Sequence, residues 1–208
     1  MMSKMLCKEA IIFFQNDKDR YYFQNNELYN LIIKAIHHAV NTYLPILVTD
    51  LRLEGQNILI NFDYYSIDTN NILVSRGLCE HFMRKMFNVN ISVNIIIMLE
   101  NHNNILGCIF TVIKTIAHEL RHVYQYLYRT DIGMDAQNIE DYTSDYEYYN
   151  DPDEMDARAY ADYFIRKYIQ NIYDWVEIYY PELFKIYVQN VCDFMIAERM
   201  NNISWKED

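Results

Sequence analysis

The first half of the chain opens with the apolar spacing of a helix and continues with that of β structure. Residues 27–44 place leucine, isoleucine and alanine at helical intervals, and Pro45 marks the expected end of this helix. Two β-like segments follow at 47–54 and 57–64, and they meet at Gly55. This arrangement predicts a hairpin whose turn is formed by the glycine and the glutamine after it.

A weaker helix is predicted near residues 76–87, while the β-branched residues of 91–99 make that segment the best predicted strand. Two positions for this strand stay open. At a sheet edge beside a cleft, the strand could pair with an extended peptide substrate. The other position is that of an internal core strand, which the run Ile95-Ile96-Ile97-Met98-Leu99 slightly favours.

The second half of the chain is predicted to be mostly helical. Helical spacing covers residues 105–128, and a helix from Asp151 to about residue 170 begins at an Asp-Pro pair. A last helix is expected over 181–200, after a Tyr-Pro pair. The segment 129–150 is acidic, rich in tyrosine and without a clear period, so we expect a loop that could serve as a lid.

The predicted helix 105–128 separates into two faces when its residues are placed about 100° apart around the axis. The apolar face, which we expect in the core, carries Ile109, Ile113, Ile116, Leu120, Val123 and Leu127. The polar face carries Thr111, Thr115, His118, His122 and Gln125. Any chemistry on this helix is therefore expected on the polar face.

Length and composition are typical of one globular domain over residues 1–208. The chain has 208 residues but only four glycines and three prolines, and no linker-like segment divides it. The formal net charge of −11 argues against nucleic acid and an anionic membrane surface as partners. Scattered cysteines without a CxxC pair favour reduced thiols. With no signal peptide or membrane span expected, the sequence predicts a cytoplasmic protein.

The string His118-Glu119-Leu120-Arg121-His122 has the HExxH spacing by which a helix presents two imidazoles to one zinc ion. Residues four apart on a helix lie about 40° apart around its axis, so both rings can converge on one cation. Glu119 lies beside the two candidate ligands, where a base is useful. The competing interpretation is that two surface histidines are stacked by coincidence.

Zinc needs a third protein ligand and an open position for water. The extended motif that supplies a third histidine is missing, because Gln125 and Tyr128 stand where it has glycine and histidine. Glu154 is the best candidate, since it shares a helix face with Ala157 and Ala161, which looks like the inward face. A carboxylate that points inward needs a partner, and a cation would supply one.

A second interpretation of Glu154 stays open at this point. With Asp151 as N-cap and Pro152 as the first helical residue, Glu154 is third, the usual position of a capping-box glutamate. Asp156 lies nearly opposite Glu154 on the helical wheel, which favours a solvated or supporting position over a ligand position. Arg158, one turn after Glu154, could form a surface ion pair with it.

The HELRH string and the later segment Glu154-Met155-Asp156-Ala157-Arg158-Ala159-Tyr160-Ala161 resemble the gluzincin class of zinc peptidases. They are most similar to the small bacterial and phage metallopeptidases of the ImmA/IrrE type, whose second motif is E-x-x-A-x-x-F-A. The resemblance covers roughly residues 112–164. Arg121 departs from the glycine that is common at its position in the family.

The resemblance implies that His118, His122 and Glu154 bind one zinc ion per chain and that Glu119 is the catalytic base. The fold expected from the pattern and the resemblance together is α+β and zincin-like. A small β-sheet would pack on the HExxH helix, and the C-terminal half would be mostly helical.

The expected activity is hydrolysis of a peptide or protein substrate, with Glu119 taking a proton from water and passing it to the leaving amine. A tyrosine before Glu154 is the expected donor to the oxyanion, as in several gluzincins, and the candidates are Tyr142, Tyr146, Tyr148 and Tyr149. One alternative is a zinc-containing but non-catalytic protein-binding module that uses the 129–150 loop. Another is a helical interaction protein without a metal.

Overall fold

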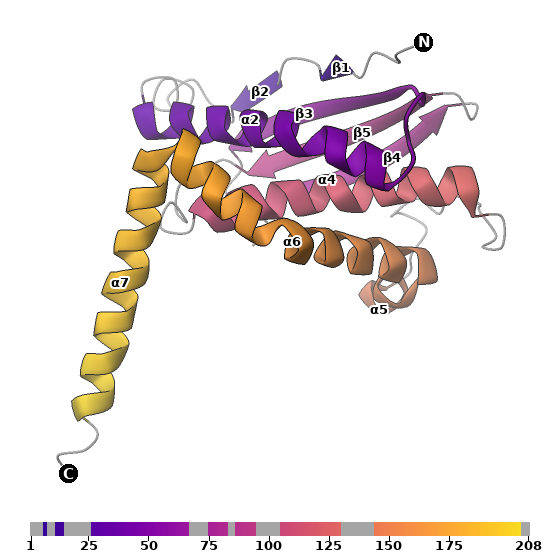
Figure 1. The fold of residues 1–208 in the computed structure, drawn as a ribbon. Helices are drawn as coiled ribbons and strands as arrows, with labels where there is room; N and C mark the ends of the chain where they lie inside the picture. Colours follow the sequence, from indigo (N-terminus) through magenta and orange to yellow (C-terminus); the bar gives the residue numbers. More distant parts are fainter. Residues whose placement is uncertain are drawn as a thin grey trace.

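A computed structural model describes residues 6–7, 11–14, 26–66, 75–82, 86–94, 105–129 and 144–204, and these form an α+β protein. The described strands are β1 (Leu6–Cys7), β2 (Ile11–Phe14), β3 (Ile58–Ser66), β4 (Ser75–Phe82) and β5 (Met86–Asn94). The described helices are α2 (Glu27–Asp50), α4 (Ile105–Tyr128), α5 (Asp145–Asn150), α6 (Pro152–Tyr179) and α7 (Pro181–Ser204). Figure 1 shows their arrangement.

The strands form one mixed sheet in the order β1-β3-β5-β4, and β2 also pairs with β3. Strand β5 runs parallel to β3, with Val89 opposite Ile60, and antiparallel to β4, with Ile91 opposite Gly77. It is therefore an internal strand, which is the second of the two positions considered for residues 91–99. The edge position is wrong, and residues 95–99 lie outside the described part of the chain.

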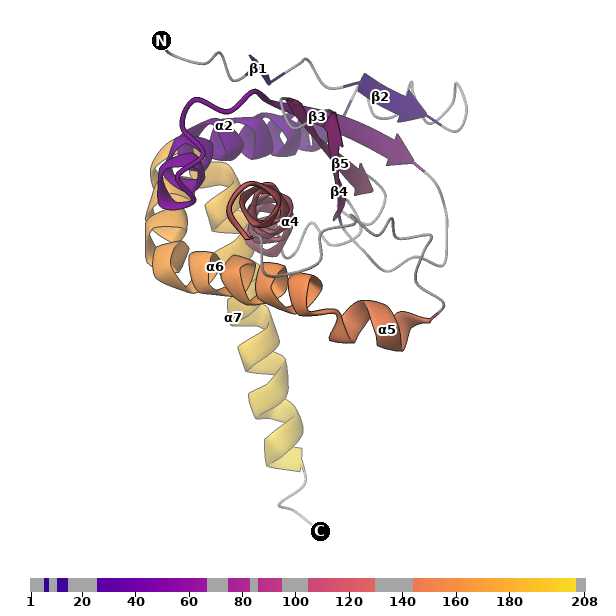
Figure 2. The ribbon, with the colours of Figure 1, turned by 90° about the vertical axis from the view of Figure 1, so that its right-hand side faces the viewer.

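One face of the sheet packs against α2 and α4, and the core lies between them (Figures 1 and 2). The inward side chains of β5 alternate with partly exposed polar ones, as expected for a strand with one covered face. Side chains buried in this core include Ile36, Leu47, Ile60, Phe62, Phe87, Val89, Ile91, Val93, Ile113 and Leu120. The expected apolar face of α4 is thus the face that enters the core.

Helix α6 packs along α4 and turns a row of small and aromatic side chains toward the interior. Ala157, Ala161 and Phe164 are fully buried, and the two alanines allow the helices to approach closely. Leu183 in the first turn of α7 is also buried. Tyr187 in the next turn still contacts Tyr173 of α6, and the later turns of α7 extend away from the rest of the molecule (Figure 2).

Helix α2 runs to Asp50 and contains Pro45, so the predicted helix end was wrong. A proline inside a helix costs about 3 kcal/mol or more. The following turns bury Leu47 and Leu51 in the core, and this apolar burial offsets the cost. The segment from residue 30 to the end of α2 is also long and apolar enough to span a bilayer, but half of it is buried within the protein, as in a core helix.

The strand predicted at 47–54 and its hairpin at Gly55 are wrong for the same reason. The first residues of that segment end α2, and Leu53 donates from its backbone N–H to the Val48 carbonyl over 2.8 Å. Arg52 has φ 55°, so the helix ends in a Schellman-type turn. Only the second predicted strand, 57–64, is confirmed, as β3.

The helix predicted near 76–87 is also wrong, because its described residues, 76–82 and 86–87, belong to β4 and to the start of β5. Pairing with β5 decides its structure, and such pairing is not visible in the local sequence. The predicted helix 105–128 has the same bounds as α4. The helices predicted at 151–170 and 181–200 are confirmed but longer, and part of the predicted loop 129–150 is helix α5.

Candidate metal centre

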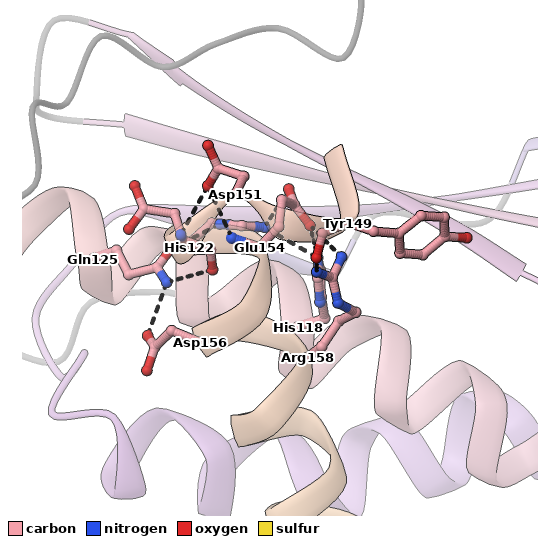
Figure 3. Close-up of polar contacts among 9 residues, drawn as sticks. His118, His122, Gln125, Tyr149, Asp151, Glu154, Asp156 and Arg158 are labelled. Carbon is pink, nitrogen blue, oxygen red and sulfur yellow. Dashed lines mark hydrogen bonds and ion pairs between the residues drawn. The ribbon is translucent and has the colours of Figure 1, made fainter. Parts of the chain in front are cut away.

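Two histidines and one glutamate converge between α4 and α6 (Figure 3). The Nε2 atoms of His118 and His122 are 3.0 Å apart, because a four-residue step on α4 stacks the two rings on one side of the helix. Glu154 of α6 places Oε2 at 3.2 Å from His118 Nε2 and Oε1 at 3.3 Å from His122 Nε2. The structure thus brings together the three residues that the sequence proposed as ligands.

The start of α6 explains why Glu154 faces α4. Asp151 is the N-cap, and its side chain accepts hydrogen bonds from the backbone N–H groups of Asp153 and Glu154. The Asp151 backbone N–H donates to the Tyr148 carbonyl over 3.4 Å, and the Glu154 carboxylate lies at the histidines instead. The side chain of Glu154 therefore does not complete a capping box.

This arrangement of residues could hold a metal ion. Glu154 Oε2 is buried and makes no hydrogen bond of good geometry to the described residues. Burial alone would raise the pKa of Glu154, but its contacts with His118 and His122 hold it well below the usual range. An ionised, buried carboxylate with a free lone pair beside two imidazole nitrogens fits a cation.

The His122 imidazole is similarly held in a charge-compensated position. Burial disfavours its charged form, but the hydrogen bond with Glu154 and the charges of Glu119 and Glu154 outweigh burial and raise the pKa of His122 to about 8. In the metal-free protein the proton on this ring therefore compensates part of the negative charge that a bound cation would compensate.

Glu119 lies beside the histidines but in a different environment. It is only 6% exposed and sits against strand β4. Burial raises the pKa of Glu119, and although the charges of His118 and His122 lower it, the net shift is upward. A carboxyl group with a raised pKa next to a candidate metal site has the property expected of a proton-transfer group.

Gly77 of β4 is part of this site and was missed in the sequence. A Cβ atom at Gly77 would overlap the Glu119 carboxylate, so the missing side chain makes the space that Glu119 occupies. The chain has only four glycines, and a glycine inside a strand often marks the close approach of another group. That signal was present, but the wrong helical assignment of 76–87 hid it.

A hydrogen-bonded chain supports His122 from the side opposite the candidate metal. Its Nδ1 lies 2.8 Å from Gln125 Oε1, and Gln125 Nε2 donates to Asp156 Oδ2 and to the Asp153 carbonyl, both over 2.8 Å. Arg121 donates to both carboxylate oxygens of Asp156, over 2.8 and 3.1 Å. Asp156 is thus neither a ligand nor simply solvated.

Helix α5 approaches the centre through Arg158. This side chain lies 3.7 Å from Glu154 Oε2, donates to the Tyr149 carbonyl, and stacks against the rings of Tyr148 and Tyr149. The expected surface ion pair between Arg158 and Glu154 is therefore partly buried. Tyr146 and Tyr149 are 77% and 60% exposed, whereas Tyr148 is half-buried.

The hydroxyl of Tyr148 is electrostatically linked to the centre. Burial, the charge of Glu154, a hydrogen bond with Glu154 and the charge of Glu119 all raise the pKa of Tyr148. The hydroxyl therefore keeps its proton and remains a hydrogen-bond donor. Tyr142, the fourth candidate from the sequence, lies outside the described residues.

The histidines not assigned to the site have ordinary packing positions where they are described. His37 packs against Phe62, and His38 lies among Trp175, Tyr179 and Tyr180. Among the described residues, Cys79, Cys108 and Cys192 are free thiols. None of these groups is among the candidate ligands, although burial and the charge of Glu119 both raise the pKa of the Cys79 thiol.

In comparisons of the chain with protein-family models, curated proteins and solved structures, no match was found. The function must therefore be inferred from the chemistry of the centre itself.

Proposed function

We propose that this protein is a zinc-dependent peptidase with a zincin-like site of the gluzincin type, which cleaves peptide or protein substrates in the cytoplasm. His118, His122 and Glu154 bind one zinc ion, and Glu119 is the general base. The observation that carries the proposal is the convergence of three ligand groups beside a fourth group, Glu119, that is buried and has a raised pKa.

The separations between the ligand atoms support zinc. A tetrahedral zinc ion with bonds of about 2.0–2.1 Å holds its ligand atoms about 3.3 Å apart. The two imidazole nitrogens are 3.0 Å apart. One Glu154 oxygen lies 3.2 Å from His118 Nε2 and the other lies 3.3 Å from His122 Nε2, and with one ligand atom for each residue all three atoms lie within 4.8 Å of one another. Two imidazoles and one carboxylate favour zinc over magnesium or calcium, which prefer oxygen ligands. Three protein ligands also leave one coordination position open, as in catalytic zinc sites.

The bound metal would supply Lewis-acid chemistry that lowers the pKa of water and polarises a peptide carbonyl. Glu119 accepts a proton from water on its carboxylate as the water oxygen attacks the carbonyl carbon. It then delivers that proton to the amine nitrogen as the carbon–nitrogen bond breaks. The raised pKa of Glu119 suits both transfers, because proton acceptance and release are then closer to balance near neutral pH.

Tyr148 is the preferred donor to the oxyanion among the candidate tyrosines. Its half-buried ring and its electrostatic link to Glu154 and Glu119 place it at the centre, unlike the more exposed Tyr146 and Tyr149. In Tyr148→Phe we expect kcat to fall by about 10- to 100-fold, at or below the range for losing one oxyanion donor, with zinc binding retained.

The non-catalytic alternative also has a specific observation in its favour. The exposed rings of Tyr146 and Tyr149 lie on α5, next to the centre, where they could contact a partner protein. In this alternative the zinc site would hold α4 and α6 together, and Glu119 would have no chemical role. The two functions therefore differ in what Glu119→Gln should change.

The test is cleavage of a proteome-derived peptide library by the zinc-loaded protein, with products identified by mass spectrometry. The proposal predicts defined cleavage sites that disappear in Glu119→Gln, because loss of the base costs about 10²- to 10⁴-fold. Glu177→Gln, on the exposed side of α6, is the matched control and should cleave normally. Stoichiometric zinc without any cleavage dependent on Glu119 would refute peptidase activity and favour the binding module.

A further inference from the structure

We propose that Arg121, Asp156 and Gln125 form an orienting chain that fixes the ring proton of His122 on Nδ1 and so presents Nε2 to the metal. The inference rests on the proposed zinc site and concerns the selection of one imidazole tautomer. A neutral imidazole can carry its proton on either nitrogen, and only the unprotonated nitrogen can bind a metal. The three residues of the chain are positioning residues, since none of them reaches the ligand atoms.

The chain begins with a carboxylate whose protonation state is fixed. Asp156 receives two hydrogen bonds from Arg121 and lies 3.3 Å from Arg129 Nη1. The two guanidinium groups compensate the negative charge of the carboxylate, and the Gln125 amide also donates to it. Asp156 is therefore ionised, and an ionised carboxylate can only accept hydrogen bonds.

The second step is the orientation of the Gln125 amide. One end of this amide lies 2.8 Å from Asp156 Oδ2 and 2.8 Å from the Asp153 carbonyl oxygen, which are both acceptors. Only the NH₂ group can occupy that end, because a carbonyl oxygen there would face two other oxygens. Gln125 is 2% exposed, so water cannot readily replace either contact.

The third step transfers this choice to the histidine. With its NH₂ group committed to Asp156 and Asp153, Gln125 turns its carbonyl oxygen toward His122 Nδ1 over 2.8 Å. An oxygen acceptor at that distance requires a proton on Nδ1. At Nε2 the same ring meets the Glu154 carboxylate at 3.3 Å and His118 Nε2 at 3.0 Å. The shorter contact of Nδ1 with Gln125 favours a neutral ring whose lone pair is on Nε2 (Figure 3).

The chain also gives a role to Arg121, which occupies the position where glycine is common in the resembled family. Its guanidinium lies 4.3 Å from the centre of the Tyr124 ring and 5.3 Å from that of Tyr160, so the cation is held in place while it binds Asp156. The partner of the metal-binding histidine is a neutral amide, and the charge that orients it lies one residue further away, on Asp156.

The test is Asp156→Asn, which keeps the shape of the side chain but lets it donate as well as accept. The Gln125 amide can then turn over and donate to His122 Nδ1, which would place the proton on Nε2. We expect ring ¹⁵N shifts of the metal-free protein, recorded at a pH where the His122 ring is neutral, to show one Nδ1–H tautomer in the wild type. The variant should show a mixture, with zinc affinity about 10- to 100-fold lower in a chelator competition.

Asp174→Asn is the matched control. Gln170 donates to Asp174 over 2.8 Å on the exposed side of α6, so this variant changes the same kind of Gln–Asp pair without a histidine. It should leave the ¹⁵N shifts and the zinc affinity unchanged. If Asp156→Asn does not fold, Gln125→Met removes the acceptor directly and should give the same mixture of tautomers and the same loss of affinity.

A wild-type His122 with its proton on Nε2, or an Asp156→Asn protein with unchanged tautomer and zinc affinity, would overturn the orienting chain. Failure of the proposed function would look different. Absent peptide cleavage would leave the tautomer and the zinc affinity as expected. A wild type that binds no zinc would refute the metal site, while the ¹⁵N shifts of the metal-free protein would still decide the tautomer.

Discussion

The two buried carboxylates beside the histidine pair lie in regions that act on them in opposite ways. On the α6 side, contacts with His118 and His122 hold the pKa of Glu154 low despite burial. On the β4 side, burial raises the pKa of Glu119 despite the same two histidines. Burial therefore dominates on one side of the pair and charge compensation on the other.

This difference teaches which carboxylate suits which role. A metal ligand should be ionised at all working pH values, as Glu154 is, whereas a proton-transfer group should exchange its proton near neutral pH. The β4 side suits the proton-transfer group, because Gly77 leaves space for the Glu119 carboxylate and has no polar side chain to compensate its charge. The different roles of Glu154 and Glu119 therefore follow from their surroundings in the fold.

The largest expected effect is a difference in zinc affinity between variants of the two carboxylates. Glu154→Gln removes an ionised ligand and should weaken zinc binding by more than about 100-fold, beyond the 10- to 100-fold typical of groups that only support a ligand. Glu119→Gln should retain zinc, because Glu119 is not a ligand in this account. Competition with a chromophoric chelator measures both, and equal losses in the two variants would contradict the separation.

A smaller effect should appear in the stability of the metal-free protein. The pKa of Glu154 is lowered by folding, so its ionised form stabilises the fold above the unfolded pKa of about 4.3, and this stability is lost as the pH falls. Glu154→Gln should therefore lower the free energy of unfolding at neutral pH by about 3 kcal/mol.

Glu119→Gln should have the opposite sign. The pKa of Glu119 is raised by folding, so the wild type loses stability as the pH rises through that pKa, and a glutamine does not. Above that pKa, the free energy of unfolding of Glu119→Gln should exceed that of the wild type by about 1.4 kcal/mol for each unit by which folding raises the Glu119 pKa. Urea unfolding in the presence of a chelator at acidic and alkaline pH measures both variants. Glu177→Gln is the exposed control, and equal signs for the two buried sites would refute the comparison.

The smallest expected effect concerns the space around Glu119. In Gly77→Ala the new Cβ forces the carboxylate or β4 to move, and we expect a loss of about 1–2 kcal/mol in unfolding free energy, within the usual range for overpacking. Zinc affinity should stay unchanged because the ligands lie on the other side. Leu78→Ala, on the exposed face of β4, should change stability by less than about 0.5 kcal/mol. A Gly77→Ala protein as stable as wild type would show that Glu119 is not confined there.

The sequence predicted the α6 side of this comparison well and the β4 side poorly. Helix α4 and its polar face follow from a long 3.6-residue period, and Glu154 follows from the face that it shares with Ala157. Residues 76–82 form strand β4 because they pair with β5, and local spacing does not record this pairing. The α6 side is built from local rules, whereas the β4 side depends on contacts between distant segments.

The orienting chain was only partly visible in the sequence for a similar reason. The polar face of α4 identified Gln125, and the helical wheel placed Asp156 away from Glu154. Their hydrogen bond depends on how α4 and α6 cross, which the two alanines of α6 permit but do not specify. Likewise, Pro45 led to a wrong prediction of where α2 ends. The helix continues to Asp50 because of tertiary packing, which the local sequence does not record.

The central claim is that one zinc ion is held by His118, His122 and Glu154. Elemental analysis of the wild-type protein, purified without chelators, tests it most directly. We predict about one zinc ion per chain, since the ligands are already assembled in the folded protein. Wild-type protein that is folded but free of zinc, and that takes up none when zinc is added, would contradict the account.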